Sequence, residues 1–353
     1  MRFTRREVFG YNGDLTGSNK WRPHGGWPGK SCSVARQQVE AALRPPLLIL
    51  ERLVYFMALP KLVAVVGANA SGKSSLGVAL ARAFDGEIVS ADSRQVFRGL
   101  DLGSGKITPE EAQGVPHHLI DAVEPDTFFS MYDFQKLAYA AIDDILARGR
   151  QPFLVGGTGL YVASVTEGYV MSDRAPDLNY RAELETYTTD ALYNMLLEKL
   201  PDVEIDRYNR NRVMRVLEKL HDGDDGHGRS EPRYETLKLG LGWDRETIRR
   251  RIDERLEKRV REGMIDEVRN LIDAGVSREF LMKLGLEYRF ITRYLGGEFS
   301  SEREMLDLLA TAIKQFAKRQ MIWFRRDPDI HWLDLSGDYK AEAMELTAAF
   351  LEK

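Results

Sequence analysis

The sequence predicts an α/β protein in which helices flank a parallel sheet built around a phosphate-binding loop, with a mostly helical insertion. A valine-rich apolar run at residues 62–66 leads directly into G-x-x-x-x-G-K-S at residues 67–74, which is the phosphate-loop signature. Further short apolar runs at residues 86–90 and 151–155, with a segment of helical periodicity between them, are typical of alternating strands and helices. From about residue 171 to residue 242 the strand pattern disappears, which indicates the insertion.

The loop predicts a site for a di- or triphosphate. Its glycines let backbone N–H groups point inward, its lysine places a positive charge on the outer phosphates, and its serine hydroxyl suits a magnesium ion. Helix-forming residues follow, so the anion would also lie at a helix N-terminus, where the helix dipole favours negative charge. The expected phosphate-binding residues are Gly67, Ala68, Asn69, Ala70, Ser71, Gly72, Lys73 and Ser74, with Ser74 also the expected metal ligand.

Two further loops are expected beside this one. The strand at residues 86–90 leads to Asp92, and the strand at residues 151–155 opens into a glycine-rich loop that carries Thr158. Because parallel strands place their carboxyl ends at one edge of a sheet, we expect Lys73, Asp92 and Thr158 to converge there. The alternative is that the glycines of the last loop only allow a tight turn and take no part in a site.

Composition indicates an ordinary globular protein. The chain has 353 residues, 43% of them hydrophobic and 29% charged, with a formal net charge of −4, which allows two domains or one domain with a large insertion. The single cysteine, Cys32, excludes an intramolecular disulfide. No apolar run approaches the roughly 18 residues that span a bilayer, so we expect a cytoplasmic protein with no membrane partner. Residues 1–56 carry nine Lys/Arg against four Asp/Glu, and we interpret them as a disordered extension or a start-site artefact.

Two basic segments indicate contact with nucleic acid. Residues 207–220 hold five basic side chains and one acidic one, and residues 310–326 hold five basic side chains interleaved with aromatic ones. Such segments suit a phosphate backbone, although solvated helix faces and core aromatics produce the same pattern.

The loss of the strand pattern sets the expected domain bounds. The core comprises residues 57–170 and 243–353, around an insertion at residues 171–242.

One long amphipathic helical stretch precedes the second basic segment. Apolar residues recur every four positions from residue 248 to residue 272, with an interruption expected at Gly263. Arg251 and Arg255 lie beside this apolar stripe, one helical turn apart.

Six motifs occur in the order found in one enzyme family. They are G-A-N-A-S-G-K-S from Gly67, S-A-D-S-R-Q-V-F-R-G from Ser90, H-H-L-I-D from His117, L-V-G-G-T-G-L-Y from Leu154, N-R-V-M-R-V-L-E from Asn211 and K-Q-F-A-K-R-Q-M-I-W-F-R from Lys314. Over about residues 62–332 the chain resembles the tRNA dimethylallyltransferase (tRNA isopentenyltransferase) family, bacterial type. Departures at Met321-Ile322, at Leu286-Glu287 and in the loop at residues 222–229 bear on substrate discrimination more than on chemistry.

The resemblance implies transfer of a dimethylallyl group from dimethylallyl pyrophosphate to N6 of the adenine that is 3′-adjacent to the anticodon. The phosphate loop would then hold pyrophosphate, with Mg²⁺, in place of ATP. Asp92 would be the general base, because the exocyclic amine must lose a proton as it attacks. Thr158 would hydrogen-bond the leaving oxygen, and Arg251, with Arg255 as the alternative, would bind the pyrophosphate from the opposite side.

The same resemblance implies a set of tRNA-binding residues. The insertion would contact the anticodon stem-loop of the tRNA, and the target adenine would leave its stack to enter the site. A monomer is expected. The residues expected to contact tRNA are Asp92, Ser93, Arg94, Gln95, Thr158, Asn211, Arg212, Arg215, Lys318, Arg319 and Gln320, together with Lys314.

Three alternatives are weighed against this interpretation. An isopentenyltransferase acting on free AMP or ADP would need no basic helices. A phosphate-loop kinase or ATPase would carry a Walker-B carboxylate, whereas the strand at residues 151–155 is followed by glycines and a threonine. A non-catalytic RNA-binding module would need no general base, which the combination of Lys73, Asp92 and Thr158 disfavours.

Overall fold

The computed structural model describes residues 59–171, 177–223 and 230–353. The interpretation of residues 1–56 as an extension or start-site artefact lies outside these ranges. In the described ranges, no helix is both long enough and apolar enough to cross a membrane.

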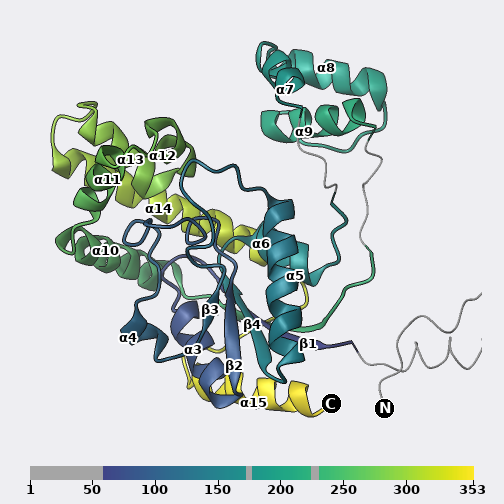
Figure 1. Ribbon diagram of the computed structural model, residues 1–353, viewed down its shortest axis with the longest axis vertical. Helices are drawn as coiled ribbons and strands as arrows, with labels where there is room; N and C mark the ends of the chain where they lie inside the picture. Colours follow the sequence, from purple (N-terminus) through teal and green to yellow (C-terminus); the bar gives the residue numbers. More distant parts are fainter. Residues whose placement is uncertain (1–58, 172–176, 224–229) are drawn as a thin grey trace, which may run out of the picture. The chain divides into compact units, whose positions relative to one another are not determined.

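A parallel sheet of six strands forms the centre of the described chain, in the order β3-β2-β4-β1-β5-β6. Figure 1 labels the strands β1 to β4 of this sheet. Strand β1 lies between β4 and β5, with Val65 paired to Val155 on one side and to Leu239 on the other. The parallel sheet expected from the sequence is thus confirmed. The strands are β1 (Lys61–Gly67), β2 (Gly86–Ser90), β3 (His117–His118), β4 (Gln151–Gly156), β5 (Glu235–Leu241) and β6 (Ile330–Trp332).

Helices make up most of the remaining described residues. The expected interruption at Gly263 is confirmed, because this residue has a φ of +99° and separates α10 from α11. The helices are α3 (Lys73–Ala83), α4 (Pro109–Ala112), α5 (Met131–Ala147), α6 (Gly159–Thr166), α7 (Leu178–Glu185), α8 (Thr189–Lys199), α9 (Arg210–His221), α10 (Arg245–Arg261), α11 (Met264–Asp273), α12 (Arg278–Leu284), α13 (Leu286–Leu295), α14 (Glu302–Phe324) and α15 (Tyr339–Glu352).

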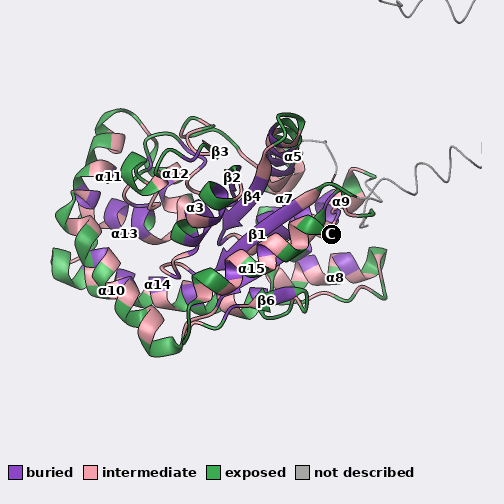
Figure 2. Cartoon of the chain, turned by 90° about the horizontal axis from the view of Figure 1, so that it is seen from below, coloured by how far each residue is buried: buried purple, intermediate pink, exposed green. Residues whose placement is uncertain are grey.

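Alternate residues of β1 pack on opposite faces of the sheet, as the pleat of a strand requires. Leu62, Ala64 and Val66 belong to an apolar cluster with residues of α5 and α6. Val63 and Val65 belong to another cluster, with residues of α3 and α15. Figure 2 shows β1, β2 and β4 buried, with the exposed residues on the surrounding helices. Burial of both faces explains why these strands are nearly continuous apolar runs in the sequence.

The strand β5 corrects the expected end of the insertion at residue 242. It pairs with β1 along its whole length, so residues 235–241 belong to the core and the insertion is shorter than expected. Lys238 obscured the strand in the sequence, because a charge in the middle of a short run does not look like a buried strand. In the structure Lys238 is buried, and its ammonium lies 2.7 Å from the carboxylate of Asp327.

The helices of the insertion, α7, α8 and α9, share a small core of their own. Leu184, Leu192, Leu196 and Leu217 are fully buried in a cluster made only of residues from 180 to 220. The expectation of a helical segment between two strands of the core is therefore confirmed for residues 178–221.

Helices α10 to α14 pack against the loops that leave the carboxyl ends of the strands. Ala68, which follows β1, and Val96, which follows β2, lie in one apolar cluster with Ile252 of α10 and Ile313 of α14. The carboxyl edge of the sheet is therefore covered by helices, and polar side chains from both sides meet in the space between them.

Candidate active site

The phosphate loop, residues 67–74, connects β1 to α3 as the sequence predicts. Gly72 caps the helix with a φ of +94°, and a Cβ on Gly67 would lie 2.8 Å from Ser71 Oγ and 2.9 Å from the Leu241 carbonyl oxygen. Both glycines are therefore required for the turn. Lys73 occupies the first turn of α3. Among the described residues, its buried ammonium has a single long hydrogen bond, of 3.4 Å, to the Ala68 carbonyl oxygen.

Asp92 and Thr158 lie on adjoining loops that follow β2 and β4. The Thr158 N–H donates to the Ala91 carbonyl oxygen at 3.2 Å, and Thr158 Oγ1 accepts the Ser93 N–H at 3.2 Å. Asp92 Oδ1 accepts the backbone N–H of Arg94 at 3.0 Å. The structure thus brings these two residues together, as the sequence predicts.

Gln320 of α14 joins the second of these loops to the phosphate loop. Its Oε1 accepts the Asn69 N–H at 2.9 Å, and its Nε2 donates to the Gly157 carbonyl oxygen at 2.8 Å. Only 8% of the residue is exposed. Gln320, one of the residues expected to contact tRNA, lines the cavity described below, and its buried amide holds the two loops together.

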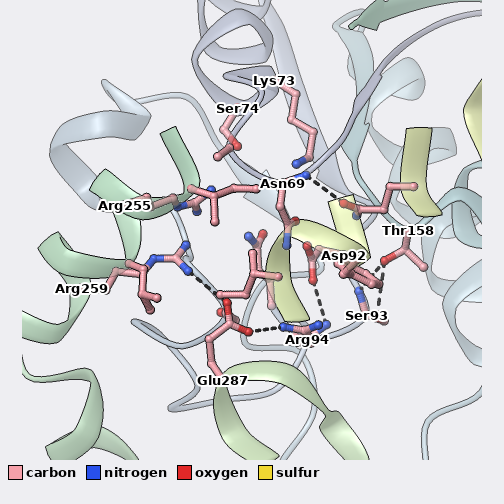
Figure 3. A pocket seen from close by; sticks show the side chains of 18 residues that line it. Asn69, Lys73, Ser74, Asp92, Ser93, Arg94, Thr158, Arg255, Arg259 and Glu287 are labelled. Carbon is pink, nitrogen blue, oxygen red and sulfur yellow. Dashed lines mark hydrogen bonds and ion pairs between the residues drawn. The ribbon is translucent and has the colours of Figure 1, made fainter. Parts of the chain in front are cut away.

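Lys73, Asp92 and Thr158 line one cavity, with Ser93, Arg94 and Gln95 on the same wall (Figure 3). The opposite wall comes from helices α10, α13 and α14. A larger cavity, of about 1090 Å³, adjoins the first. Both cavities are lined by Ala70, Lys73, Ser74, Arg255 and Arg259.

The shared boundary carries more positive than negative charge. Burial lowers the pKa of Lys73 to about 8, with nearby Asp92 opposing this and Arg255 and Arg259 adding to it. Burial, reinforced by the neighbouring Arg259, also lowers the pKa of Arg255 to about 10. Three cations crowded in a buried space, with Asp92 beside them, make a site that is stabilised by a bound anion.

Arg251 does not line either cavity, although the sequence analysis placed it at the pyrophosphate. Its guanidinium stacks on Trp243, 4.9 Å from the ring centre, behind Gly72 of the phosphate loop. Trp243 in turn donates its indole N–H to the Ser71 carbonyl oxygen at 2.7 Å. Arg255, the stated alternative, faces the cavity, and so does Arg259. Arg259 follows Arg255 by four residues on the same helix, so the two side chains lie on one face. This spacing is the feature of the sequence that could have identified Arg259 as a cavity residue.

A glycine-rich loop, residues 98–106, holds the arginines of α10. Arg255 Nη2 donates to the Gly105 carbonyl oxygen at 3.3 Å, which also accepts from Gln95 Nε2 at 3.1 Å. The carboxylate of Glu267 anchors this loop by accepting three consecutive backbone N–H groups, and it accepts the Tyr288 hydroxyl at 3.0 Å as well.

Glu287 of α13 is a cavity residue that the sequence analysis marked only as a departure from the family pattern. It is 2% exposed, and its Oε2 accepts a hydrogen bond from Arg94 Nη1 at 2.7 Å. Its Oε1 lies 3.7 Å from Arg259 Nη1. The guanidinium of Arg94 also lies 5.5 Å from the centre of the Phe316 ring. The charge of Arg94, one of the residues expected to contact tRNA, is thus paired with Glu287 in the wall of the cavity.

The other residues expected to bind tRNA lie outside this cavity. Asn211 and Arg212 are exposed on α9, and Arg215 is paired with the buried Glu218 at 3.2 Å. On α14, Lys318 and Arg319 are exposed. Lys314 pairs with Asp253 at 2.6 Å, and together with Lys318 it lines a third cavity, between α10 and α14.

The donor set near the loop fits a magnesium ion that arrives with a phosphate ligand. In the part of the chain that the structure describes, no group of three or more His, Cys, Asp or Glu side chains could hold a metal by itself. Ser74 is exposed and lines both cavities. Magnesium is commonly bound by few protein ligands together with substrate phosphates and water, and a single serine hydroxyl suits that arrangement.

Comparison with known proteins agrees with this geometry. A family model described as IPP transferase matches residues 95–327, and one described as isopentenyl transferase matches residues 60–124. The chain belongs to the IPP transferase family. The resemblance based on the six sequence motifs is thereby confirmed.

Individual members of the family align over most of the chain. A tRNA dimethylallyltransferase 2 of Shewanella sediminis is 45% identical over 296 residues, which cover 81% of this chain and 97% of that protein. The crystal structure of a tRNA isopentenylpyrophosphate transferase from Bacillus halodurans matches with a TM-score of 0.63 at 39% identity, over 83% of this chain and 97% of its own. A eukaryotic dimethylallyltransferase acting on tRNA matches with a TM-score of 0.70 at 24% identity, over 83% of this chain and 80% of its own, and supports the fold alone.

Proposed function

We propose that this IPP transferase family member transfers a dimethylallyl group from dimethylallyl pyrophosphate to N6 of the adenine 3′-adjacent to the anticodon of tRNA, with release of pyrophosphate. One observation carries the proposal: the carboxylate of Asp92 and the cations Lys73, Arg255 and Arg259 line a single cavity. The reaction needs a proton acceptor at the amine and positive charge at the leaving group. The cavity has both.

The cationic side of the cavity would bind the leaving group. Pyrophosphate lies in the phosphate loop, against inward-pointing backbone N–H groups and the ammonium of Lys73. As the allylic C1–O bond breaks, negative charge grows on the pyrophosphate, and Arg255 and Arg259 stabilise it from α10. Loss of one such donor typically costs about 3–4 kcal/mol of transition-state stabilisation. Ser74 would hold a magnesium ion bound with the pyrophosphate, and that ion would supply further charge neutralisation.

Asp92 would act on the acceptor. The lone pair of N6 forms the new bond to C1, and the amine proton passes to the Asp92 carboxylate, a contribution of roughly 10²–10⁴-fold in rate. Thr158, whose hydroxyl is fixed by the Ser93 N–H, hydrogen-bonds the leaving oxygen. Ser93 and Gln95 lie on the same wall as Asp92 and contact the edge of the extruded adenine.

Exposed basic side chains would bind the rest of the tRNA. Asn211, Arg212 and Arg215 on α9 contact the anticodon stem-loop, and Lys318 and Arg319 on α14 contact its phosphates. Such a surface is unnecessary for free AMP or ADP, and this favours RNA as the acceptor. We propose that the active species is a monomer, because the residues assigned to the reaction, Lys73, Asp92, Thr158, Arg255 and Arg259, already line a single cavity within one copy of the chain.

The test is incubation of the purified full-length protein with anticodon stem-loop RNA, Mg²⁺ and labelled dimethylallyl pyrophosphate, followed by nucleoside analysis. We expect label on N6 of the adenine next to the anticodon. Parallel reactions contain AMP in place of RNA, or ATP in place of dimethylallyl pyrophosphate. Transfer to AMP but not to RNA, or hydrolysis of ATP without prenyl transfer, would refute the proposal.

A further inference from the structure

Arg94 is a cation beside the proposed general base. It follows Asp92 by two residues, and its backbone N–H already bonds Asp92 Oδ1 at 3.0 Å. A guanidinium paired with this carboxylate would stabilise its charged form and so make it a weaker base. A working site therefore needs the Arg94 side chain to be held elsewhere.

Two contacts hold the Arg94 side chain against the opposite wall. Its Nη1 donates to Glu287 Oε2 at 2.7 Å, and its guanidinium lies 5.5 Å from the centre of the Phe316 ring. The side chain of Glu287 is 3% exposed and that of Arg94 is 13% exposed, so water competes little for this ion pair. Figure 3 shows Glu287 joined to Arg94, with Asp92 on the other side of the guanidinium.

Glu287 itself is unsuited to accept the substrate proton. One of its oxygens is bonded to Arg94, and the other lies 3.7 Å from Arg259. By contrast, Asp92 accepts a single hydrogen bond, from a backbone N–H, among the bonds of the described residues. The two carboxylates of the cavity therefore have different environments.

We propose that Glu287 is a positioning residue that holds the guanidinium of Arg94 away from Asp92 and so leaves the Asp92 carboxylate available to take the amine proton. The inference rests on the proposed function. The titratable and charged groups that face Asp92 are Lys73 of α3, Arg94 of its own loop, Tyr161 of α6, Arg255 and Arg259 of α10, and Glu287 of α13. Of the four cations, only Arg94 both follows Asp92 by two residues in the sequence and donates a hydrogen bond to an acid, Glu287.

The test measures the single-turnover rate of prenyl transfer against pH, with saturating RNA and dimethylallyl pyrophosphate. In Glu287→Gln we expect the acid limb of the profile to move at least about one pH unit lower, the shift typical of a carboxylate that gains a guanidinium partner. We also expect the plateau rate to fall at least about tenfold. In the double variant Glu287→Gln with Arg94→Gln, the limb should return toward its wild-type position and most of the lost rate should be recovered.

Two further variants separate positioning from stability. Glu287→Asp keeps the negative charge and should keep the wild-type acid limb with a smaller loss of rate. Glu87→Gln removes another buried carboxylate, which lies near the start of β2 and pairs with Arg148 and Arg150. It should lower the melting temperature without moving the limb.

An unmoved limb in Glu287→Gln, or a double variant no faster than the single one, would overturn the role of Glu287 while wild-type transfer stands. Absence of transfer by the wild-type protein would overturn the proposed function and this inference with it.

Discussion

The substitution Gly105→Ala tests most directly whether Arg255 and Arg259 must lie where the structure has them. A Cβ at this position would lie 1.4 Å from Arg259 Nη2 and 2.2 Å from Arg255 Nη2. Normal contact is about 3.5 Å, so the Arg259 guanidinium must move by about 2 Å. The guanidinium is the end of a flexible side chain, so this movement costs little stability. The movement nevertheless takes both cations away from their positions in the cavity.

The magnitudes follow from this geometry. A displacement of about 1 Å can cost 10²-fold in rate, and loss of one charge-stabilising donor costs about 10²–10³-fold, so we expect kcat to fall by about 10²–10³. Gly105 has a φ of +67°, and alanine there costs about 1–2 kcal/mol, which is a fall of a few degrees in melting temperature. The assays are single-turnover prenyl transfer and thermal unfolding.

Gly149→Ala is the matched control. Gly149 has a φ of +75°, and a Cβ there would meet nothing within 4 Å. It should lose similar stability and keep its activity. If Gly105→Ala has a rate within about threefold of that of Gly149→Ala, then Arg255 and Arg259 are not needed where the structure has them.

Three further predictions concern the base, the RNA surface and the acid stability of the fold. Asp92→Asn should lower the transfer rate at least about a hundredfold with RNA affinity little changed, as measured by single turnover and RNA titration. Lys318→Ala should weaken RNA binding and reduce the salt slope of log K by about one, with pyrophosphate binding unaltered. Hydrogen bonds from Arg148, His118 and Arg150 hold the pKa of Glu87 near 2, against 4.5 in a free chain, which corresponds to about 3 kcal/mol. Glu87→Gln should therefore be less stable at pH 7 by about that amount in urea unfolding, with the difference shrinking as the pH falls from 4.5 toward 2.

Each of these predictions has an outcome that contradicts it. Unchanged turnover in Asp92→Asn would remove the general base from the mechanism. An unaltered salt slope in Lys318→Ala would mean that this lysine contacts no phosphate. For Glu87→Gln, a stability deficit that persists undiminished at pH 2 would show that the loss comes from packing and not from the charge of the carboxylate.

Long-range packing explains the corrections to the site. Arg251 and Arg255 are one turn apart on α10, and which of them faces the cavity depends on how the helix rests on Trp243 and the phosphate loop. Glu287 meets Arg94 across 193 residues of sequence, so no local pattern relates them. The resemblance places Gln320 among the tRNA-binding residues, and only the packing of α14 shows that its amide also joins two loops of the site.

The sequence by itself determined the strand, loop and helix around Lys73, the placement of Asp92 and Thr158 at the same edge of the sheet, and the family. These features depend on neighbouring residues, or on the rule that parallel strands end together, and both can be recognised along a chain. Only the tertiary structure decided that β5 belongs to the core, that Arg255 and Arg259 form the cationic wall, and that Glu287 restrains Arg94. Those outcomes depend on the orientation of each helix relative to the sheet, which is set by contacts between residues far apart in the sequence.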